Sequence, residues 1–230
     1  MERFSRTISL LGERNFKKIR DRSVIVFGLG GVGGFVCEAF ARSGVGRIDV
    51  VDSDVVSKSN INRQVIALSS TVGMKKTTVQ KARILDINPD CVCEAFDVFY
   101  KGNDVALEKY DYIVDAIDTV TSKLSLIKNA ANAGVPIISS MGTGNKYDPM
   151  SFKIADINKT SVCPLARVMR RELKQTGINK LTVLYSTEPP VTPETPVTSE
   201  NGRHPPASIA YVPSVAGFLI AKYVIESFFK

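Results

Sequence analysis

Short apolar runs alternate with longer segments of helical periodicity over the first 140 residues of the chain. The apolar runs are rich in valine and isoleucine, as buried strands of a parallel sheet are, and they lie at residues 23–27, 47–51, 92–98, 112–117 and 135–139. Helical spacing of apolar side chains follows the first run and recurs at residues 73–87 and 120–133. This alternation predicts an α/β fold with a Rossmann-like, mostly parallel sheet and helices on both faces.

The pattern changes after about residue 140. Residues 151–155 and 181–185 predict two further strands, one on either side of a basic helix at 164–175, and therefore a smaller C-terminal strand extension. Residues 187–208 hold six of the eleven prolines and almost no large apolar side chain, which predicts a flexible loop. Residues 212–229 predict a packed C-terminal helix and residues 1–22 a helical arm, so residues 1–230 are expected to form one domain.

Composition and charge narrow the class of protein. With 44% hydrophobic and 23% charged residues, the chain is typical of a soluble globular protein, and its formal charge of +7 suits a polyanionic partner. Its four cysteines form no Cys-x-x-Cys pair, which excludes the common zinc site built from two such pairs. The same cysteine pattern argues against a disulfide scaffold and favours a reduced, cytoplasmic setting. We expect no secretory signal at the N-terminus. Lys222 and Glu226 interrupt the C-terminal apolar stretch, so we expect this stretch to pack in the core and not on a membrane.

A glycine motif follows the first predicted strand. Gly28, Gly30 and Gly33 have the spacing Gly-x-Gly-x-x-Gly and open a predicted helix, whose free N–H groups and positive dipole end suit a phosphate. Asp52 ends the next strand, where a carboxylate can accept both ribose hydroxyls. The alternative is a glycine turn that only packs a helix on a strand. The motif alone does not separate a dinucleotide from ATP.

Cations downstream of Asp52 favour ATP. Arg63 and Lys76 could neutralise the charge that grows on the α-phosphate and on the departing pyrophosphate in nucleotidyl transfer. Asp118 ends the fourth predicted strand, at the edge where such sheets bind ligands, and could hold Mg²⁺. The alternatives are a solvated polar loop with surface ion pairs, and a nicotinamide dehydrogenase, for which the two cations would have no role.

As a set, these motifs resemble the ThiF/MoeB family of adenylating enzymes, which are related to ubiquitin-activating enzymes. The set comprises the glycine segment with Gly31, the segment Asp52-x-Asp54-x-Val56-x-x-Ser59-Asn60-x-x-Arg63-Gln64, then Gly73-x-x-Lys76 and Asp115-x-x-Asp118. The resemblance implies that ATP is bound by Gly28, Gly30, Gly31, Gly33, Asp52, Asp54, Asn60, Arg63, Gln64 and Lys76. It implies that Asp118 holds Mg²⁺, and that Arg6 reaches into the site of a partner subunit, so that the protein is a homodimer.

The second half of the chain indicates the branch of the family. It lacks the two Cys-x-x-Cys zinc pairs of the sulfur-carrier activators. Together with the N-terminal segment Arg3-Phe4-Ser5-Arg6-Thr7, its motifs instead resemble the branch that dehydrates threonylcarbamoyladenosine in tRNA. These motifs are Ser140-Met141-Gly142-x-Gly144-Asn145-Lys146-x-Asp148-Pro149, Asp156-Ile157-x-Lys159-Thr160, Cys163-Pro164-Leu165-Ala166-Arg167 and residues 212–217. That resemblance implies an ATP-dependent cyclisation through an acyl-adenylate, with modified tRNA as a partner. It leaves room for an accessory sulfur-transfer protein.

Three features stay open at this stage. Cys163 could be a nucleophile with a pKa lowered by Arg167, or a small apolar filler near a helix start, which we favour. His204 could be a general base but lies in the proline-rich loop, which favours a solvated bystander. The basic segments 1–20 and 159–180 could contact tRNA phosphates or form a solvated face. Two further alternatives are an enzyme that adenylates the C-terminus of a ubiquitin-like carrier, and a module that keeps the nucleotide pocket without chemistry.

Overall fold

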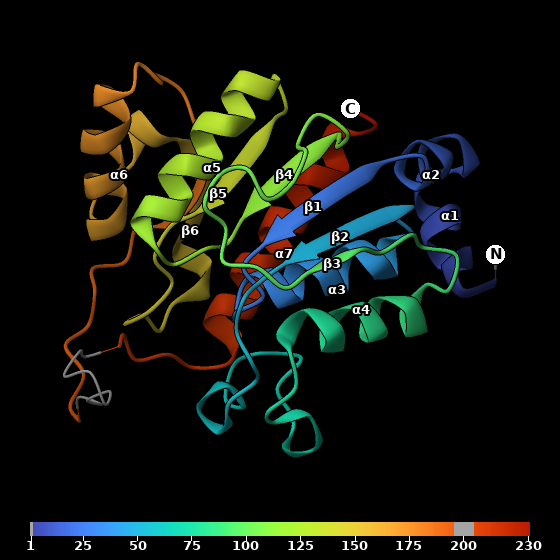
Figure 1. Cartoon of the computed structure of the whole chain (residues 1–230), viewed down its shortest axis with the longest axis horizontal. Helices are drawn as coiled ribbons and strands as arrows, with labels where there is room; N and C mark the ends of the chain where they lie inside the picture. Colours follow the sequence, from blue (N-terminus) through green and yellow to red (C-terminus); the bar gives the residue numbers. More distant parts are fainter. Residues whose placement is uncertain (1, 196–204) are drawn as a thin grey trace.

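A seven-stranded sheet forms the centre of the computed structural model, which describes residues 2–195 and 205–230 (Figure 1). Its strand order is β3-β2-β1-β4-β5-β7-β6, and the described strands run parallel to their neighbours except β6, which is antiparallel to β7. The strands are β1 (Ser23–Phe27), β2 (Arg47–Val51), β3 (Ala95–Phe96), β4 (Tyr112–Asp115), β5 (Ile137–Ser140), β6 (Phe152–Asp156) and β7 (Thr182–Ser186). Because β2 and β4 flank β1, the strand order reverses there and opens a crevice at the carboxyl ends of the strands.

Helices cover both faces of the sheet. One face carries α3 (Gly33–Ser43), α4 (Lys76–Ile87) and α7 (Tyr211–Ser227), and the other carries α5 (Val120–Ala133) and α6 (Pro164–Gln175) (Figure 1). The arm helices α1 (Ser5–Leu11) and α2 (Glu13–Arg20) lie at the amino end of β1 (Figure 1). Short 3₁₀ helices are η1 (Glu2–Phe4), η2 (Lys58–Asn60), η3 (Ser69–Thr71), η4 (Pro149–Ser151) and η5 (Ile157–Lys159).

Strand β1 shows why its sequence is continuously apolar. Val24 and Val26 pack into the cluster beneath α3 and α7, whereas Ile25 and Phe27 pack into the cluster beneath α5. All four side chains are fully buried. A strand that is covered on both faces cannot alternate between apolar and polar residues, and this is the feature that predicted a parallel sheet.

Helix α7 lies in close contact with the start of α3. A side chain at Gly217 would place its Cβ 2.6 Å from the carbonyl oxygen of Val32, so the two helices approach closely only because this position is glycine. The approach also brings Pro213 over Gly31, where an added Cβ would lie 3.0 Å from that of Pro213. The C-terminal helix therefore packs against the glycine motif.

The predicted fold class is confirmed, and several element boundaries differ from the prediction. The strand expected at 92–98 is reduced to Ala95–Phe96, with an isolated bridge from Val92 to Arg47, because it lies at the edge of the sheet. The helix expected from residue 73 begins at Lys76, since Gly73 has a φ of 89°, outside the helical region. The strand expected at 112–117 ends at Asp115, where the chain turns toward the crevice.

Other predictions can also be compared with the structure. The cysteines are all free. Among the described residues, none of the helices combines the length and apolar character needed to cross a membrane. The proline-rich loop has no helix or strand over residues 187–195 and 205–208; its residues 196–204, which include His204, lie outside the described residues.

Candidate active site

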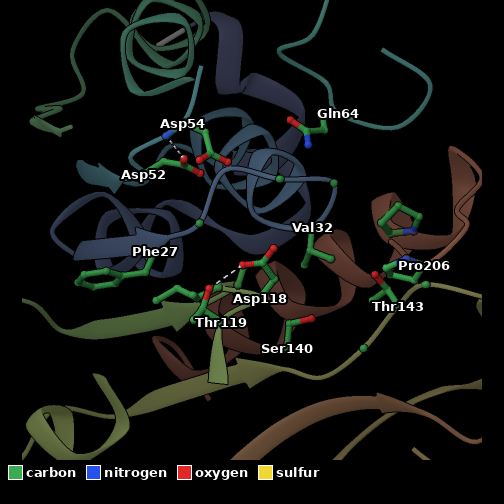
Figure 2. Close-up of a pocket in the computed structure, with 18 of the residues that line it drawn as sticks. Phe27, Val32, Asp52, Asp54, Gln64, Asp118, Thr119, Ser140, Thr143 and Pro206 are labelled. Carbon is green, nitrogen blue, oxygen red and sulfur yellow. Dashed lines mark hydrogen bonds between the residues drawn. The ribbon is translucent and has the colours of Figure 1, made fainter. Parts of the chain in front are cut away.

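A pocket of about 800 Å³ opens at the carboxyl ends of β1, β2, β4 and β5. Figure 2 shows Asp52 and Asp54 on one side of this pocket, Thr143 and Pro206 on the other, and Asp118 between them. The pocket therefore has two ends, built by different halves of the chain. We call the end beside Asp52, where the sequence predicts a nucleotide, the nucleotide end, and the end beside Thr143, where the expected acyl substrate would lie, the acyl end.

The glycine turn, residues 28–33, forms one wall of the nucleotide end. Gly28 has a φ of 86°, and a Cβ there would lie 2.6 Å from the carbonyl oxygen of Ala116 at the end of β4. Gly30 and Gly31 line the pocket and leave the backbone accessible to a ligand. Gly33 was predicted to contact the nucleotide, but it does not line the pocket. A Cβ there would lie 1.8 Å from the carbonyl oxygen of Gly28, so the turn leaves no room for a side chain at this position.

Asp52 ties the glycine turn to the loop that follows β2. Its Oδ2 accepts the backbone N–H of Leu29 at 2.6 Å, and its Oδ1 accepts that of Asp54 at 2.8 Å. Burial raises the pKa of Asp52 above its ordinary value of 3.8, while the charge of Lys76 and the two backbone donors oppose this effect. A carboxylate has about four acceptor sites, so both oxygens can also accept ribose hydroxyls.

Lys76 and Asp54 form an ion pair in the wall of the pocket. The Nζ of Lys76 lies 2.7 Å from Oδ2 of Asp54, and the lysine side chain is 7% exposed whereas that of the aspartate is 65% exposed. The first residue of α4 is Lys76, and its backbone N–H donates to the carbonyl oxygen of Asp54 at 3.0 Å. The neighbouring Lys75 pairs instead with Asp97, away from the pocket. The structure thus brings together two residues that were each predicted to bind ATP, and it separates the two adjacent lysines.

The loop after Asp54 places three more predicted residues on the pocket wall. Asn60 uses its Oδ1 to accept the backbone N–H of Ser57, and Arg63 donates to the carbonyl oxygen of Ser59 and to Oδ1 of Asn62. Gln64 is buried, and its Oε1 has no hydrogen-bond partner among the described residues. A buried acceptor that lines a pocket and lacks a partner fits a ligand that donates to it.

Asp118 projects from the turn that follows β4. Its side chain is exposed, and its Oδ1 accepts the hydroxyl of Thr119 at 3.2 Å (Figure 2). Among the described residues there is no group of three or more His, Cys, Asp or Glu side chains that could hold a metal ion. Mg²⁺ is commonly bound by one or two carboxylates together with substrate phosphates and water, so a single carboxylate facing the glycine turn fits this ion.

A buried ion pair that the sequence analysis missed supports the turn that carries Asp118. The Nζ of Lys123 lies 3.0 Å from Oδ2 of Asp115, and both side chains are fully buried. Lys123 also donates to the carbonyl oxygen of Ile117, Asp115 accepts the N–H of Ile117, and Ser139 donates to Asp115. The signal for it was present, because Lys123 lies on the same buried face of the helix at 120–133 as Leu126 and Ile127.

The acyl end is lined by residues from β5, the start of α6 and the proline-rich loop. They are Ser140, Met141, Gly142, Thr143, Gly144, Lys146, Cys163, Pro164, Leu165, Pro205 and Pro206. Cys163 lines the pocket and is 3% exposed, packed with Met169 and Leu173. Its burial supports the interpretation as an apolar filler, and the side chain of Arg167 is exposed.

Arg6 does not line the pocket. It is exposed on α1, at the amino end of the sheet and away from the carboxyl ends of the strands (Figure 1). Within one chain, the structure therefore does not bring Arg6 to the site. The contact that was predicted for Arg6 requires a second copy of the chain.

The sequence from residue 4 to residue 230 matches the ThiF family. The chain belongs to the ThiF family. This ThiF family member is 42% identical over 245 residues to the tRNA threonylcarbamoyladenosine dehydratase of Bacillus subtilis (strain 168), and the match covers 100% of this chain and 96% of that protein. Membership of the ThiF family argues against the nicotinamide dehydrogenase that the glycine motif alone allowed.

Two solved structures show the same ThiF family fold. They are crystal structures of E. coli tRNA N6-threonylcarbamoyladenosine dehydratase, one in complex with ATP and one in complex with AMP, and each has a TM-score of 0.90 to this chain. Their sequences are 32% and 33% identical to it, and the matches cover 99% of this chain and 93% and 94% of those chains.

Proposed function

We propose that this protein is an ATP-dependent enzyme that dehydrates threonylcarbamoyladenosine in tRNA. The observation that carries the proposal is the single pocket that joins the glycine turn to the acyl end, in a chain that matches a dehydratase of this kind along its whole length. A tRNA substrate also gives a role to the charge of +7, and it supports the proposal that the enzyme acts in the cytoplasm.

The first step is adenylation of the substrate. An oxygen of the threonine carboxylate attacks the α-phosphorus of ATP, the bond from that phosphorus to the bridging oxygen breaks, and pyrophosphate leaves. The backbone N–H groups of the glycine turn, the amino end of α3 and the cations of Arg63 and Lys76 oppose the charge that develops on the phosphates. When bound by Asp118 and the phosphates, Mg²⁺ supplies further neutralisation of the triphosphate.

The second step closes a ring. A heteroatom of the carbamoyl group attacks the activated carbonyl carbon, the bond from that carbon to AMP breaks, and a proton from an N–H of the carbamoyl group passes to solvent. One water is lost from the modification overall, since its oxygen leaves with AMP. Nucleophile and electrophile belong to one side chain, and effective molarities of about 10⁵ M or more are known for well-oriented intramolecular pairs. A covalent intermediate on Cys163 is therefore not needed.

The surface beside the acyl end suits an RNA backbone. Helix α6 begins at Pro164 in the pocket wall, and its exposed cations, Arg167, Arg171 and Lys174, extend away from it. Arg170 is excluded from this set because it donates to Ile157 and Thr160 within the fold. We propose that these cations bind tRNA phosphates, which position the anticodon loop without reading its sequence. An accessory sulfur-transfer protein stays a prediction from the family resemblance.

We also propose a homodimer in which Arg6 completes the site of the partner subunit. This arrangement would explain why Arg6 lies at the far end of the sheet from its own pocket. Mixing an Arg6→Ala chain with a Lys76→Ala chain tests it. If Arg6 acts across the interface, the mixed dimers regain activity at one of their two sites, whereas neither variant is active alone.

Mass spectrometry of tRNA nucleosides tests the proposed function. After incubation of modified tRNA with the protein, ATP and Mg²⁺, the mass of threonylcarbamoyladenosine should fall by one water, with one pyrophosphate released per turnover. The principal rival is adenylation of the C-terminus of a ubiquitin-like carrier. Pyrophosphate exchange that depends on such a carrier, with no change in the mass of the tRNA nucleoside, would support the rival and overturn the proposal.

A further inference from the structure

Lys146 is a buried cation at the acyl end of the pocket. The residue is 4% exposed and lines the pocket, and its Nζ donates to the backbone carbonyl oxygen of Glu188 at 2.5 Å. Among the residues that the structure describes, the ion pairs do not include Lys146, so no carboxylate lies within ion-pair distance of this ammonium group. An ammonium group has three donors, so two are available to a ligand.

The side-chain carboxylate of Glu188, whose carbonyl oxygen Lys146 contacts, is engaged by other donors. Oε1 of Glu188 accepts the backbone N–H of Tyr147 at 2.9 Å, and Oε2 accepts that of Asp148 at 3.0 Å. The backbone carbonyl oxygen of Glu188 therefore contacts Lys146, whereas its carboxylate contacts the backbone of Tyr147 and Asp148. This arrangement fixes the loop and leaves the positive charge of Lys146 without a counter-charge from Glu188.

Asn145 fixes the backbone immediately before Lys146. It adopts a φ of 57°, and it exchanges hydrogen bonds with Ala207 through its backbone N–H and its Oδ1, both at 2.7 Å. Its carbonyl oxygen accepts the N–H of Val191 at 2.8 Å. Asparagine tolerates this left-handed conformation better than most residues. The ammonium group of Lys146 is thus held in place before any substrate arrives.

We propose that Lys146 binds the carboxylate of the threonyl group and presents it for adenylation, an inference that rests on the proposed function. The acyl end is where a substrate carboxylate must lie if its oxygen is to reach the α-phosphorus of an ATP bound at the glycine turn. A buried cation without a counter-charge favours an anionic ligand over an isosteric neutral one. Lys146 therefore makes the enzyme specific for a free acid.

A comparison of two ligands that differ only in charge tests this role. They are anticodon stem-loops that carry either threonylcarbamoyladenosine or its primary carboxamide, with binding measured by fluorescence anisotropy in the absence of ATP. Wild-type protein should bind the acid at least tenfold more tightly than the carboxamide. Lys146→Gln keeps a donor for the carbonyl oxygen of Glu188 but lacks the charge, so it should lose this preference and bind the carboxamide as wild type does. Lys146→Arg should keep part of the preference.

The matched control is Lys153→Gln, because Lys153 is exposed on β6 and is absent from the pocket. It should leave both affinities unchanged. If Lys146→Gln weakens the acid and the carboxamide equally, or if wild type shows no preference, Lys146 does not bind the carboxylate and the inference is overturned. Dehydration of the acid stem-loop by wild type with ATP is scored separately, so a failure of the proposed function is distinguished from a failure of this inference.

Discussion

The ammonium nitrogen of Lys123 lies 3.0 Å from the carboxylate of Asp115, and neither side chain is exposed to solvent. Both residues also hold the backbone of Ile117, one at its carbonyl oxygen and the other at its N–H. The pair therefore fixes the turn between β4 and α5, from which Asp118 projects into the pocket. Asp115 of this structural ion pair and the candidate magnesium ligand Asp118 are only three residues apart.

Removal of one member of this pair should destabilise the protein strongly. We expect Lys123→Met to lower the free energy of unfolding by about 3–5 kcal/mol, because Asp115 is left charged and buried without a counter-charge. Urea unfolding followed by circular dichroism measures this. Lys128→Met on the exposed side of the same helix is the control and should change stability little. Equal effects of the two substitutions would contradict the assigned role of the buried pair.

Two adjacent lysines should differ sharply in their effect on catalysis. Lys76→Ala should lower kcat/KM for dehydration by about 10² or more, because a pre-organised cation beside the phosphates is lost. Lys75→Ala should stay close to wild type, since its ammonium group pairs with Asp97 outside the pocket. Steady-state pyrophosphate release measures both. A loss of similar size for Lys75→Ala would show that the effect reflects the start of α4 and not the side chain in the pocket.

Substitutions at two glycines with positive φ should distinguish the effect of backbone strain from that of a steric clash. Gly134→Ala, at the end of α5, has open space around the new Cβ and should cost about 1 kcal/mol of stability while ATP binding is retained. Gly28→Ala adds a clash with the carbonyl oxygen of Ala116, so it should be less stable still and should not bind ATP. Thermal unfolding and calorimetric titration with ATP measure the two effects. Normal ATP affinity in Gly28→Ala would refute the close approach of β1 and β4.

The thiols of Cys91, which is buried, and Cys93, which is half-buried, should make stability fall at alkaline pH. Burial raises the pKa of Cys91 to about 11 and that of Cys93 to about 12, from an ordinary value of 9.0. The folded chain keeps these protons where the unfolded chain releases them, so the stabilisation is complete below about pH 9 and is lost as the pH rises toward 11 to 12. Between pH 9 and 10 each thiol should lower the free energy of unfolding by about 1 kcal/mol.

Urea unfolding at pH 8, 9 and 10 checks this dependence against a Cys91→Ala/Cys93→Ala variant. Other groups that titrate in the same range are common to both proteins, so the difference between the two slopes belongs to the thiols. The variant should lose less stability than wild type between pH 9 and 10. Parallel slopes would show that the two thiols have ordinary pKa values in the folded chain.

Local signals in the sequence predicted the nucleotide end of the pocket well. Asp52 directly follows β2, Lys76 begins α4 and Asp118 lies in the short turn between β4 and α5, so the order of the elements brings all three to one edge of the sheet. The glycine spacing predicted the turn for a physical reason, since Gly28 and Gly33 have no room for a side chain. These residues could be placed because their positions follow from secondary structure.

The acyl end could not be placed in the same way. Pro206 and Cys163 reach the pocket through long-range packing, and Asn145 contacts Ala207 across 62 residues of sequence. Lys123 was missed because helical periodicity marks its position as buried but does not show which carboxylate meets it. Arg6 lies away from the pocket of its own chain, so its predicted role depends on a contact between subunits.

The two ends of the pocket are continuous, and this has a consequence for inhibition. A molecule that links adenosine to an aminoacyl group through a sulfamate, which cannot expel AMP, would occupy both ends at once. Its affinity should exceed that of either fragment by a large factor, since the second half binds without a further loss of translational freedom. Asp118 and Thr143 line one continuous pocket, in which an acid can reach a nucleotide. The same continuity makes the enzyme a target for bisubstrate compounds.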